Sequence, residues 1–234
     1  MEPRHPPEHI GLAAGEPAVR LRSVVALLGG FPALAGADLT VETGEVVLLR
    51  GPNGAGKSTV LRVCAGLVPV AQGEASVLGV DIVRDRTAVR RRVAMLGHAG
   101  FLYDDLTVRE NVTFAVRAAG GDLASVDGAL ERLGLAGRLA TTRAAALSAG
   151  QRRRTSLAAL VARGAELWLL DEPHAGLDEE GRDLIDGVVR DATAAGATVL
   201  IASHDTDRAT ALSTRVLTVA GGMVHTNVGR VRVP

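Results

Sequence analysis

Short apolar runs recur along the chain and predict the strands of a sheet. The runs EVVLL, ELWLL and TVLIA each have the length of a strand, and polar residues follow each of them. Between several such runs lie stretches rich in Ala, Leu and Arg that suit helices, so the pattern predicts an α/β fold with a largely parallel sheet. The predicted strands cover residues 19–24, 38–41, 45–49, 74–77, 92–96, 167–170, 198–202 and 215–219.

The segment from about residue 100 to residue 163 has a different pattern. It contains the helical patterns VRENVTFAVRAAG, SVDGALERLGL and QRRRTSLAALVARG, without a convincing strand. We therefore expect a helical subdomain inserted into the α/β core. Residues 1–17 are rich in Pro, Gly and charge, which predicts a flexible tail ahead of a single domain over residues 18–230.

Composition narrows the classes of function. The 26 basic residues balance the 26 acidic residues, so no net field attracts the chain to nucleic acid, and no nucleic-acid partner is expected. The single cysteine, Cys64, lacks a partner for a disulfide or a zinc site, which favours a reducing compartment such as the cytoplasm. No apolar run approaches the roughly 18–20 residues of a membrane-spanning helix. The arginine triplets 90–92 and 152–154 are interpreted as solvated surface.

The stretch GPNGAGKST, at residues 51–59, follows the apolar run EVVLL and precedes a helical run. This strand, loop and helix order is typical of a P-loop, in which glycines let backbone N–H groups point at phosphate oxygens. Lys57 is expected to reach the β- and γ-phosphates, and Ser58 to ligate Mg²⁺. The candidate nucleotide-binding residues of this loop are Gly51, Pro52, Asn53, Gly54, Ala55, Gly56, Lys57, Ser58 and Thr59.

Two further strand ends carry chemistry that suits a nucleotide site. ELWLLDEP places Asp171 where it can hold Mg²⁺ through water, and Glu172 where it can act as general base. TVLIASHD places His204 where it can donate a hydrogen bond toward the γ-phosphate. Taken alone, an Asp-Glu pair is often a helix-capping turn and a lone histidine is often structural. The order of these elements after a P-loop favours the functional interpretation.

The motif LSAGQ at residues 147–151 distinguishes among P-loop proteins. With it, the chain resembles the ATP-binding cassette (ABC) family from about residue 19 to residue 228, although Ala149 stands where the family ordinarily has glycine. The resemblance makes 51–59 the Walker A motif, 147–151 the signature, 167–172 Walker B, AGLD at 175–178 the D-loop, and His204 the switch histidine. It implies a P-loop core of ABC type with an antiparallel β subdomain and an inserted α-helical subdomain.

The resemblance also implies partners and cofactors. Two copies of such a cassette form a head-to-tail dimer that closes on two ATP molecules with Mg²⁺. Each ATP is held by Walker A of one copy and the signature of the other. In this chain Ser148, Gly150 and Gln151, together with Asp178 of the D-loop, would thus serve the partner's nucleotide. Separate membrane permease subunits would be the other partner, which implies a cytoplasmic protein on the inner face of the membrane.

The stretch LGHAGFLYDDLT departs from the usual family pattern. Most cassettes carry a glutamine here that contacts Mg²⁺ and the attacking water and forms a hinge to the helical subdomain; in this chain that place falls on His98. The candidate catalytic residues are therefore Glu172, His204, Lys57 and His98. The haem-exporter ATPase subunits of cytochrome c maturation look similar in Leu-Gly-His and in LSAGQ followed by arginines. That subfamily is the favoured assignment.

Several alternatives stay open at the level of sequence. The cassette suits an exporter of drugs, lipids or other small molecules, and a soluble cassette ATPase acting on ribosomes or DNA is a third possibility. The adenine contact is another open point, because Leu28 stands where the family usually has an aromatic residue, with Phe31 nearby. The apolar cluster Phe101, Leu102, Tyr103 and Leu106 predicts either a groove for a short permease helix, or, for Phe101 and Leu106, the core of the helical subdomain.

Overall fold

The structure is a computed structural model that describes residues 15–97, 101–204 and 206–226. Within those residues, four strands form an antiparallel sheet in the order β2-β1-β4-β5. These strands are β1 (Val19–Leu28), β2 (Phe31–Val41), β4 (Gln72–Val77) and β5 (Val80–Asp81). In β2, Leu34 and the alternate residues Ala37, Leu39 and Val41 are buried against the core, as expected of a sheet with one solvated face.

A second sheet holds the remaining strands of the described chain, in the order β10-β9-β3-β8-β7-β6. They are β3 (Val46–Arg50), β6 (Val93–Leu96), β7 (Leu167–Asp171), β8 (Thr198–Ala202), β9 (Arg215–Ala220) and β10 (Met223–Thr226). β10 pairs with β9 antiparallel, whereas the other neighbours are parallel. Strands β7 and β8 are buried along their whole length, which explains their uninterrupted apolar sequences.

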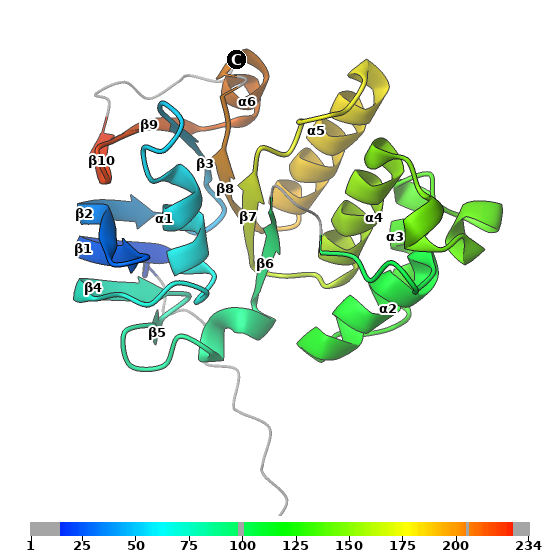
Figure 1. The fold of residues 1–234 in the computed structure, drawn as a ribbon, viewed down its shortest axis with the longest axis horizontal. Coiled ribbons are helices and arrows are strands. Elements are labelled where there is room, and N and C mark those ends of the chain that lie inside the picture. Colours follow the sequence, from blue (N-terminus) through cyan, green and yellow to red (C-terminus); the bar gives the residue numbers. More distant parts are fainter. Residues whose placement is uncertain (1–14, 98–100, 205, 227–234) are drawn as a thin grey trace, which may run out of the picture.

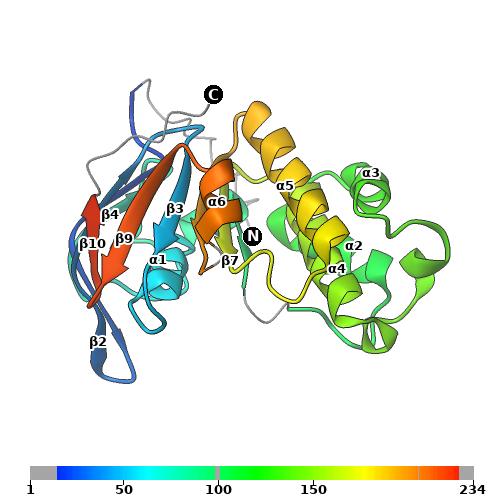
Figure 2. The same ribbon diagram turned by 90° about the horizontal axis from the view of Figure 1, so that it is seen from above.

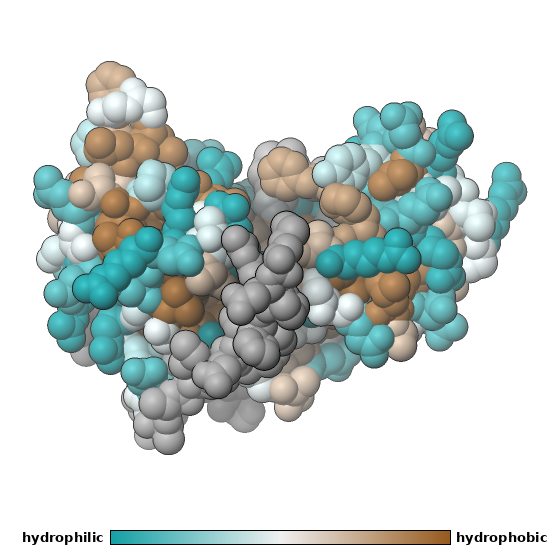
Figure 3. Space-filling model, turned by 90° about the horizontal axis from the view of Figure 1, so that it is seen from below, coloured by the Kyte–Doolittle hydropathy of each residue, from teal (hydrophilic) through white to brown (hydrophobic). Residues whose placement is uncertain are grey.

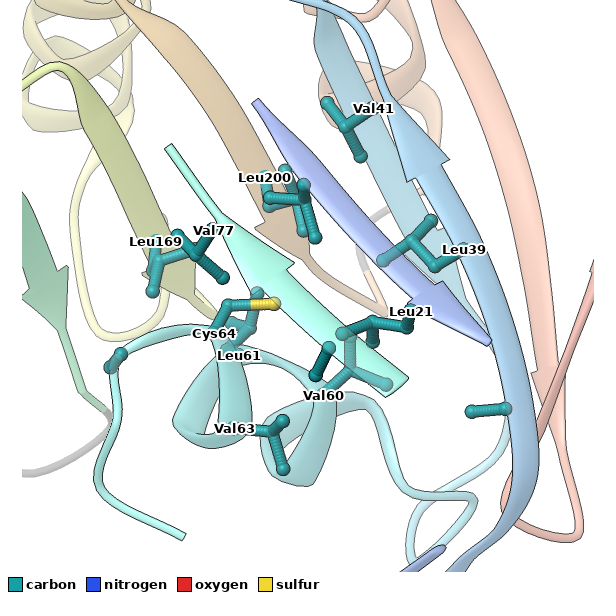
Figure 4. Packing of buried hydrophobic residues seen from close by; sticks show 14 of the residues in the cluster. Leu21, Leu39, Val41, Val60, Leu61, Val63, Cys64, Val77, Leu169 and Leu200 are labelled. Atoms are coloured by element: carbon teal, nitrogen blue, oxygen red, sulfur yellow. The ribbon is translucent and has the colours of Figure 1, made fainter. Parts of the chain in front are cut away.

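Helix α1 (Lys57–Cys64) lies between the two sheets (Figure 1). Its apolar face belongs to one buried cluster with residues of both sheets, among them Leu21, Leu169 and Leu200. Figure 4 shows this packing, with Leu61 and Cys64 of the helix near Leu169 and Val77. Burial raises the pKa of the Cys64 thiol to about 12, so the cysteine is an apolar core residue. The packing fixes the loop before α1 at the carboxyl end of β3.

The opposite face of the second sheet is covered by helices. They are α2 (Val108–Ala119), α3 (Ser125–Arg132), α4 (Ala149–Ala162), α5 (Glu179–Ala194) and α6 (Thr206–Leu212), with short 3-10 turns at Gly137–Thr141 and Ala144–Ala146. Another 3-10 turn, Ala88–Arg91, lies on the side of α1, where Val89 belongs to the first cluster. Helices α2, α3 and α4 pack on one another, and α5 lies beside α4 (Figure 2). A second buried cluster joins them to Leu48, Leu170 and Ile201 of the sheet. Thr107 and Glu110 form a capping box that starts α2.

The observed elements extend and correct the sequence prediction. The strand predicted at 38–41 is the end of the longer β2, while β5 and β10 were not predicted. The interpretation of the arginine triplets as solvated surface was wrong for Arg92 and Arg153. Arg92 forms a bidentate pair with Glu166 at 2.6 and 2.8 Å, and Arg153 is 8% exposed.

Apolar side chains also remain on the surface. Figure 3 shows them exposed among charged side chains on the sheet-bearing half and on the helical half of the molecule. Among the described residues, no helix has the length and apolar character needed to span a membrane.

Candidate functional site

The loop between β3 and α1 is shaped by glycines that no other residue could replace. A Cβ on Gly51 would lie 2.1 Å from the carbonyl oxygen of Val219, and Gly56 has a φ of 110° in the left-handed region. Lys57 folds back over this loop and donates from Nζ to the carbonyl oxygens of Gly51, at 2.7 Å, and Pro52, at 3.1 Å. The ammonium group is therefore held at the centre of the loop, where it can meet an anion.

The parallel sheet brings β7 to the same edge. Ser58 Oγ donates to Asp171 Oδ1 at 3.0 Å, which joins the first turn of α1 to the end of β7. Asp171 is 3% exposed. A hydroxyl and a carboxylate are oxygen ligands of the kind that Mg²⁺ takes alongside nucleotide phosphates. The described residues contain no cluster of three or more His, Cys, Asp or Glu side chains that could hold a metal ion.

Glu172 adopts a backbone conformation that is unfavourable for any residue with a side chain. Its φ is 48°, in the left-handed region, and its backbone N–H donates to Ala202 of β8 at 2.8 Å. Its carboxylate Oε2 accepts from Ser203 Oγ at 3.1 Å and from the His204 backbone at 3.2 Å, and it lies 2.9 Å from His204 Nδ1. The end of β8 thus fixes this carboxylate, while the His204 side chain stays 70% exposed.

These side chains open onto one cavity of about 490 Å³. Leu28, the residue in the place of the usual aromatic, lines it, whereas Phe31 is not among the lining residues and is 78% exposed, outside the core. The remaining lining residues are Ala33, Asn53, Gly54, Ala55, Gly56, Lys57, Ser58, Thr59, Asp171, Glu172 and His204. The structure therefore brings together most of the loop and both acidic residues with the histidine at a single site.

The signature residues lie elsewhere and have a local structural role. Ser148 is the N-cap of α4, and Ser148 and Gln151 form a capping box, with Ser148 Oγ accepting from the Gln151 N–H at 3.2 Å. Asp178 is the N-cap of α5 and accepts from the Gly181 N–H at 2.9 Å. None of these residues, nor Gly150, lines the cavity of its own chain. His98 lies outside the described residues.

Arg153 is a functional candidate that sequence reasoning missed. From the second turn of α4 its guanidinium donates to the carbonyl oxygens of Gly97 (2.6 Å), Asp171 (3.0 Å), Glu172 (2.5 Å) and Pro173 (3.2 Å). Burial lowers the pKa of this guanidinium, and the charges of Asp171 and Glu172 partly offset that effect. Helical spacing would have found it, because Arg153 shares a face with the buried Leu157 and Leu160.

A separate apolar groove of about 270 Å³ lies where β6 ends beside α2 and α4. Phe101, which is 89% exposed, and Tyr103, which is 56% exposed, line it together with Phe114 of α2. Tyr103 and Phe114 meet edge to face at 5.0 Å. Asn111 fixes the loop by donating from Nδ2 to the Tyr103 and Leu106 carbonyls and accepting from the Tyr103 N–H. The alternative that Phe101 fills the core is therefore wrong, while Leu106 is half-buried.

Comparisons with known proteins agree on one family. The family described as ABC transporter matches residues 34–175. The cytochrome c biogenesis ATP-binding export protein CcmA of Paramagnetospirillum magneticum is 39% identical over 191 residues, which cover 78% of this chain and 86% of that protein. CcmA of Cupriavidus pinatubonensis is 39% identical over 200 residues, which cover 83% and 86% respectively.

A solved structure supports the same fold. The ATP-binding cassette MJ0796, solved as a dimer in a post-hydrolysis state with ADP and phosphate bound, superposes with a TM-score of 0.82 at 25% identity. The match covers 90% of this chain and 99% of that one.

Proposed function

Because this chain belongs to the ABC transporter family and is an ATP-binding ATPase of that family, we propose that it powers a membrane permease for haem export in cytochrome c biogenesis. The observation that carries the ATPase proposal is the single cavity onto which Lys57, Ser58, Asp171, Glu172 and His204 open. Relatives that are export proteins of cytochrome c biogenesis, at 39% identity over most of their length, support the assignment of the cargo.

In this proposal the loop holds the nucleotide phosphates. Backbone N–H groups of residues 54–59 and the start of α1 form an anion site, and Lys57 adds a positive charge toward the β- and γ-phosphates. Ser58 and Asp171 would hold Mg²⁺, which supplies charge neutralisation on the phosphate oxygens. Leu28 would contact the adenine by apolar packing alone, so selectivity for the base rests on weaker interactions than ring stacking.

Glu172 would polarise the attacking water. Its carboxylate is oriented by Ser203 and His204, so that little rearrangement is needed when water and phosphate meet. The exposed side of His204 would donate toward the γ-phosphate. His98 would replace the hinge glutamine, since a neutral imidazole offers one donor and one acceptor.

A second copy of the chain would complete the site. Ser148, Gly150 and Gln151 cap the N-terminus of α4 at a place outside their own cavity, and Asp178 starts α5. A helix N-terminus attracts an anion such as the γ-phosphate held by the partner. The structural relative solved as a dimer with ADP and phosphate supports this arrangement. Closing and reopening of the dimer would transmit the energy of hydrolysis.

The permease would dock in the apolar groove. Phe101 and Tyr103 are exposed, yet the hydrogen bonds of Asn111 fix their loop, which suits an anchor for a short helix. Through this contact the chain would sit on the cytoplasmic face of the membrane. An exporter of drugs or lipids would use the same machinery, so the cargo is decided by the permease.

The test replaces Glu172 by Gln, which keeps the shape of the side chain and removes the base. We expect Mg²⁺-dependent ATP hydrolysis to fall by on the order of 10²- to 10⁴-fold while ATP binding is retained. In cells lacking the native gene, the wild-type chain should restore covalently haem-loaded c-type cytochromes and Glu172→Gln should not. Hydrolysis at the native rate would refute the role of Glu172, whereas normal c-type cytochromes without the gene would refute the haem assignment alone.

A further inference from the structure

Behind the contact between Glu172 and His204 lies a buried polar cluster that the nucleotide cavity does not include. His174, two residues after Glu172 in the sequence, is 3% exposed. Its Nε2 lies 2.8 Å from Oδ1 of Asp186, which is 5% exposed and belongs to α5. An imidazole and a carboxylate are thus buried close to Glu172 in the sequence and the fold. Burying polar groups costs free energy unless they form hydrogen bonds, and these two bind each other.

Arg208 reaches the same carboxylate from the other side. It lies on α6, in the turn after His204, and its Nη1 is 2.5 Å from Asp186 Oδ2 and 2.8 Å from Asp183 Oδ1. Its Nη2 pairs with Glu179 at the start of α5. Each oxygen of Asp186 therefore binds a group from a different segment: one from the loop after Glu172, the other from the helix after His204.

The hydrogen-bond geometry of His174 indicates which ring nitrogen donates to Asp186. His174 Nδ1 is buried without a hydrogen-bond partner among the described residues, so a proton on it would be an unsatisfied buried donor. The neutral ring with its proton on Nε2 satisfies the contact to Asp186. His174 therefore links two segments of the chain: a single hydrogen bond from its ring to Asp186 attaches the loop after Glu172 to α5.

The contacts of His174 and Arg208 with Asp186 help to hold Glu172 in its unfavourable backbone conformation. A residue with a side chain keeps a φ of 48° only when its surroundings determine it. At the front, Glu172 contacts Ser203 and His204; at the back, the segments that follow Glu172 and His204 meet at Asp186. Movement of either segment would pull the carboxylate away from the histidine.

We propose that His174, Asp186 and Arg208 are positioning residues that hold Glu172 against His204 in the geometry needed for hydrolysis. This inference rests on the proposed roles of Glu172 and His204. Asp186 lies on α5, the helix that Asp178 of the D-loop caps. The contact between His174 and Asp186 therefore also links the D-loop to the segment that carries Glu172.

The experiment compares two substitutions of His174 in the full-length chain. His174→Met removes the donor at similar volume, whereas His174→Gln keeps an N–H near the position of Nε2. Steady-state ATP hydrolysis with Mg²⁺, direct ATP binding and thermal melting are measured for each. We expect His174→Met to lower kcat by on the order of 10- to 100-fold with KM within about twofold, as for a small misplacement of a reacting group. His174→Gln should recover most of that loss.

A matched control is the Arg132→Met variant, which breaks another ion pair onto α5, at 2.7 Å to Asp191, far from the cavity lining. It should leave kcat unchanged. The proposal is overturned if folded His174→Met keeps native kcat, if His174→Gln is as slow as His174→Met, or if the fall in apparent kcat only matches the fraction of protein that is unfolded. If His174→Met does not fold, Arg208→Lys takes its place in the test. This change keeps the positive charge but removes the paired N–H donors of the guanidinium, and the same loss of kcat is expected.

The outcome for Glu172→Gln separates this inference from the function on which it rests. If Glu172→Gln is inactive and His174→Met is native, only the positioning inference fails. If Glu172→Gln itself hydrolyses ATP at the native rate, the proposed function fails instead.

Discussion

At the scale of the residue, Arg153 joins parts of the chain that the sequence keeps far apart. Its planar guanidinium donates to carbonyls that follow β6 and end β7, a pattern that the ammonium of lysine cannot reproduce. It lies in the same helix as the capping residues of the signature. The helix that would face the partner's nucleotide is thus bonded to the backbone of Glu172 in its own chain.

Arg153→Met tests the importance of this contact. Each buried carbonyl left without a donor costs about 1–3 kcal/mol, and we expect a total loss of about 3 kcal/mol because water reaches some of them. For a chain of this size that corresponds to a fall in Tm of about 6–12 °C, measured by calorimetry. The control is Arg152→Met, which loses a partly exposed pair with Asp104 and a single carbonyl contact, to Ala144, together worth about 1–2 kcal/mol. Equal shifts for the two variants would contradict a special role for Arg153.

At the scale of the element, the loop between β6 and α2 presents aromatic residues that the fold does not need for its own core. Phe101 and Tyr103 stand on a segment tied to α2 by Asn111, and α2 itself begins with a capping box. An exposed apolar groove with a rigid wall is typical of a docking site. Gly97 and Phe101, which flank residues 98–100 in the sequence, both line this groove.

Replacing both Phe101 and Tyr103 by Ser should detach the chain from its membrane partner. Because both side chains are exposed and the edge contact of Tyr103 with Phe114 is worth about 0.5–1.5 kcal/mol, the chain should still fold and bind ATP. We expect the fraction that co-sediments with membranes containing the permease to fall about tenfold or more, as for loss of a central anchor. Phe31→Ser, at another exposed aromatic, is the control. Undiminished co-sedimentation, or loss of the cooperative melting transition, would argue against the docking site.

At the scale of the whole molecule, the cavity and the signature residues, which we propose to form one nucleotide site, do not meet within the chain. The cavity is lined by residues of the loop, β7 and the end of β8, whereas the capped start of α4 lies outside it. This separation is explained if the second half comes from another copy. A symmetric pair with this arrangement would bind two nucleotides.

A mixing experiment tests the dimer. Lys57→Ala should weaken ATP binding on the order of 10- to 100-fold, because a charge-assisted contact to phosphate is lost. Ser148→Arg should leave binding to the monomer intact and block closure. A mixture of the two variants retains one intact composite site, so ATP should drive heterodimers, seen by light scattering in a Glu172→Gln background. If the mixture shows no ATP-dependent association while the unmodified Glu172→Gln chain dimerises, the composite site is refuted.

The sequence by itself determined the local chemistry. The glycine spacing of residues 51–59, the apolar strands β3, β7 and β8 and the polar residues at their ends are short-range patterns, and parallel strands must bring those ends to one edge. The family followed from the order of these motifs. The start of α4 was readable as well, since a capping box is a signal within four residues.

Only the tertiary structure decided which polar residues are buried and what they bind. His174 and Arg208 each sit in a polar stretch, and their partners come from other elements, so no local pattern distinguishes them from solvated residues. Helical spacing places Arg153 on the buried face of α4, but only the tertiary structure shows which carbonyl oxygens it binds. The exposure of Phe101 and Phe31 was equally undecided, because an apolar residue in a loop can face the core or the solvent. The strained φ of Glu172 likewise depends on β8 and α5, whose contacts hold a conformation that its own sequence disfavours.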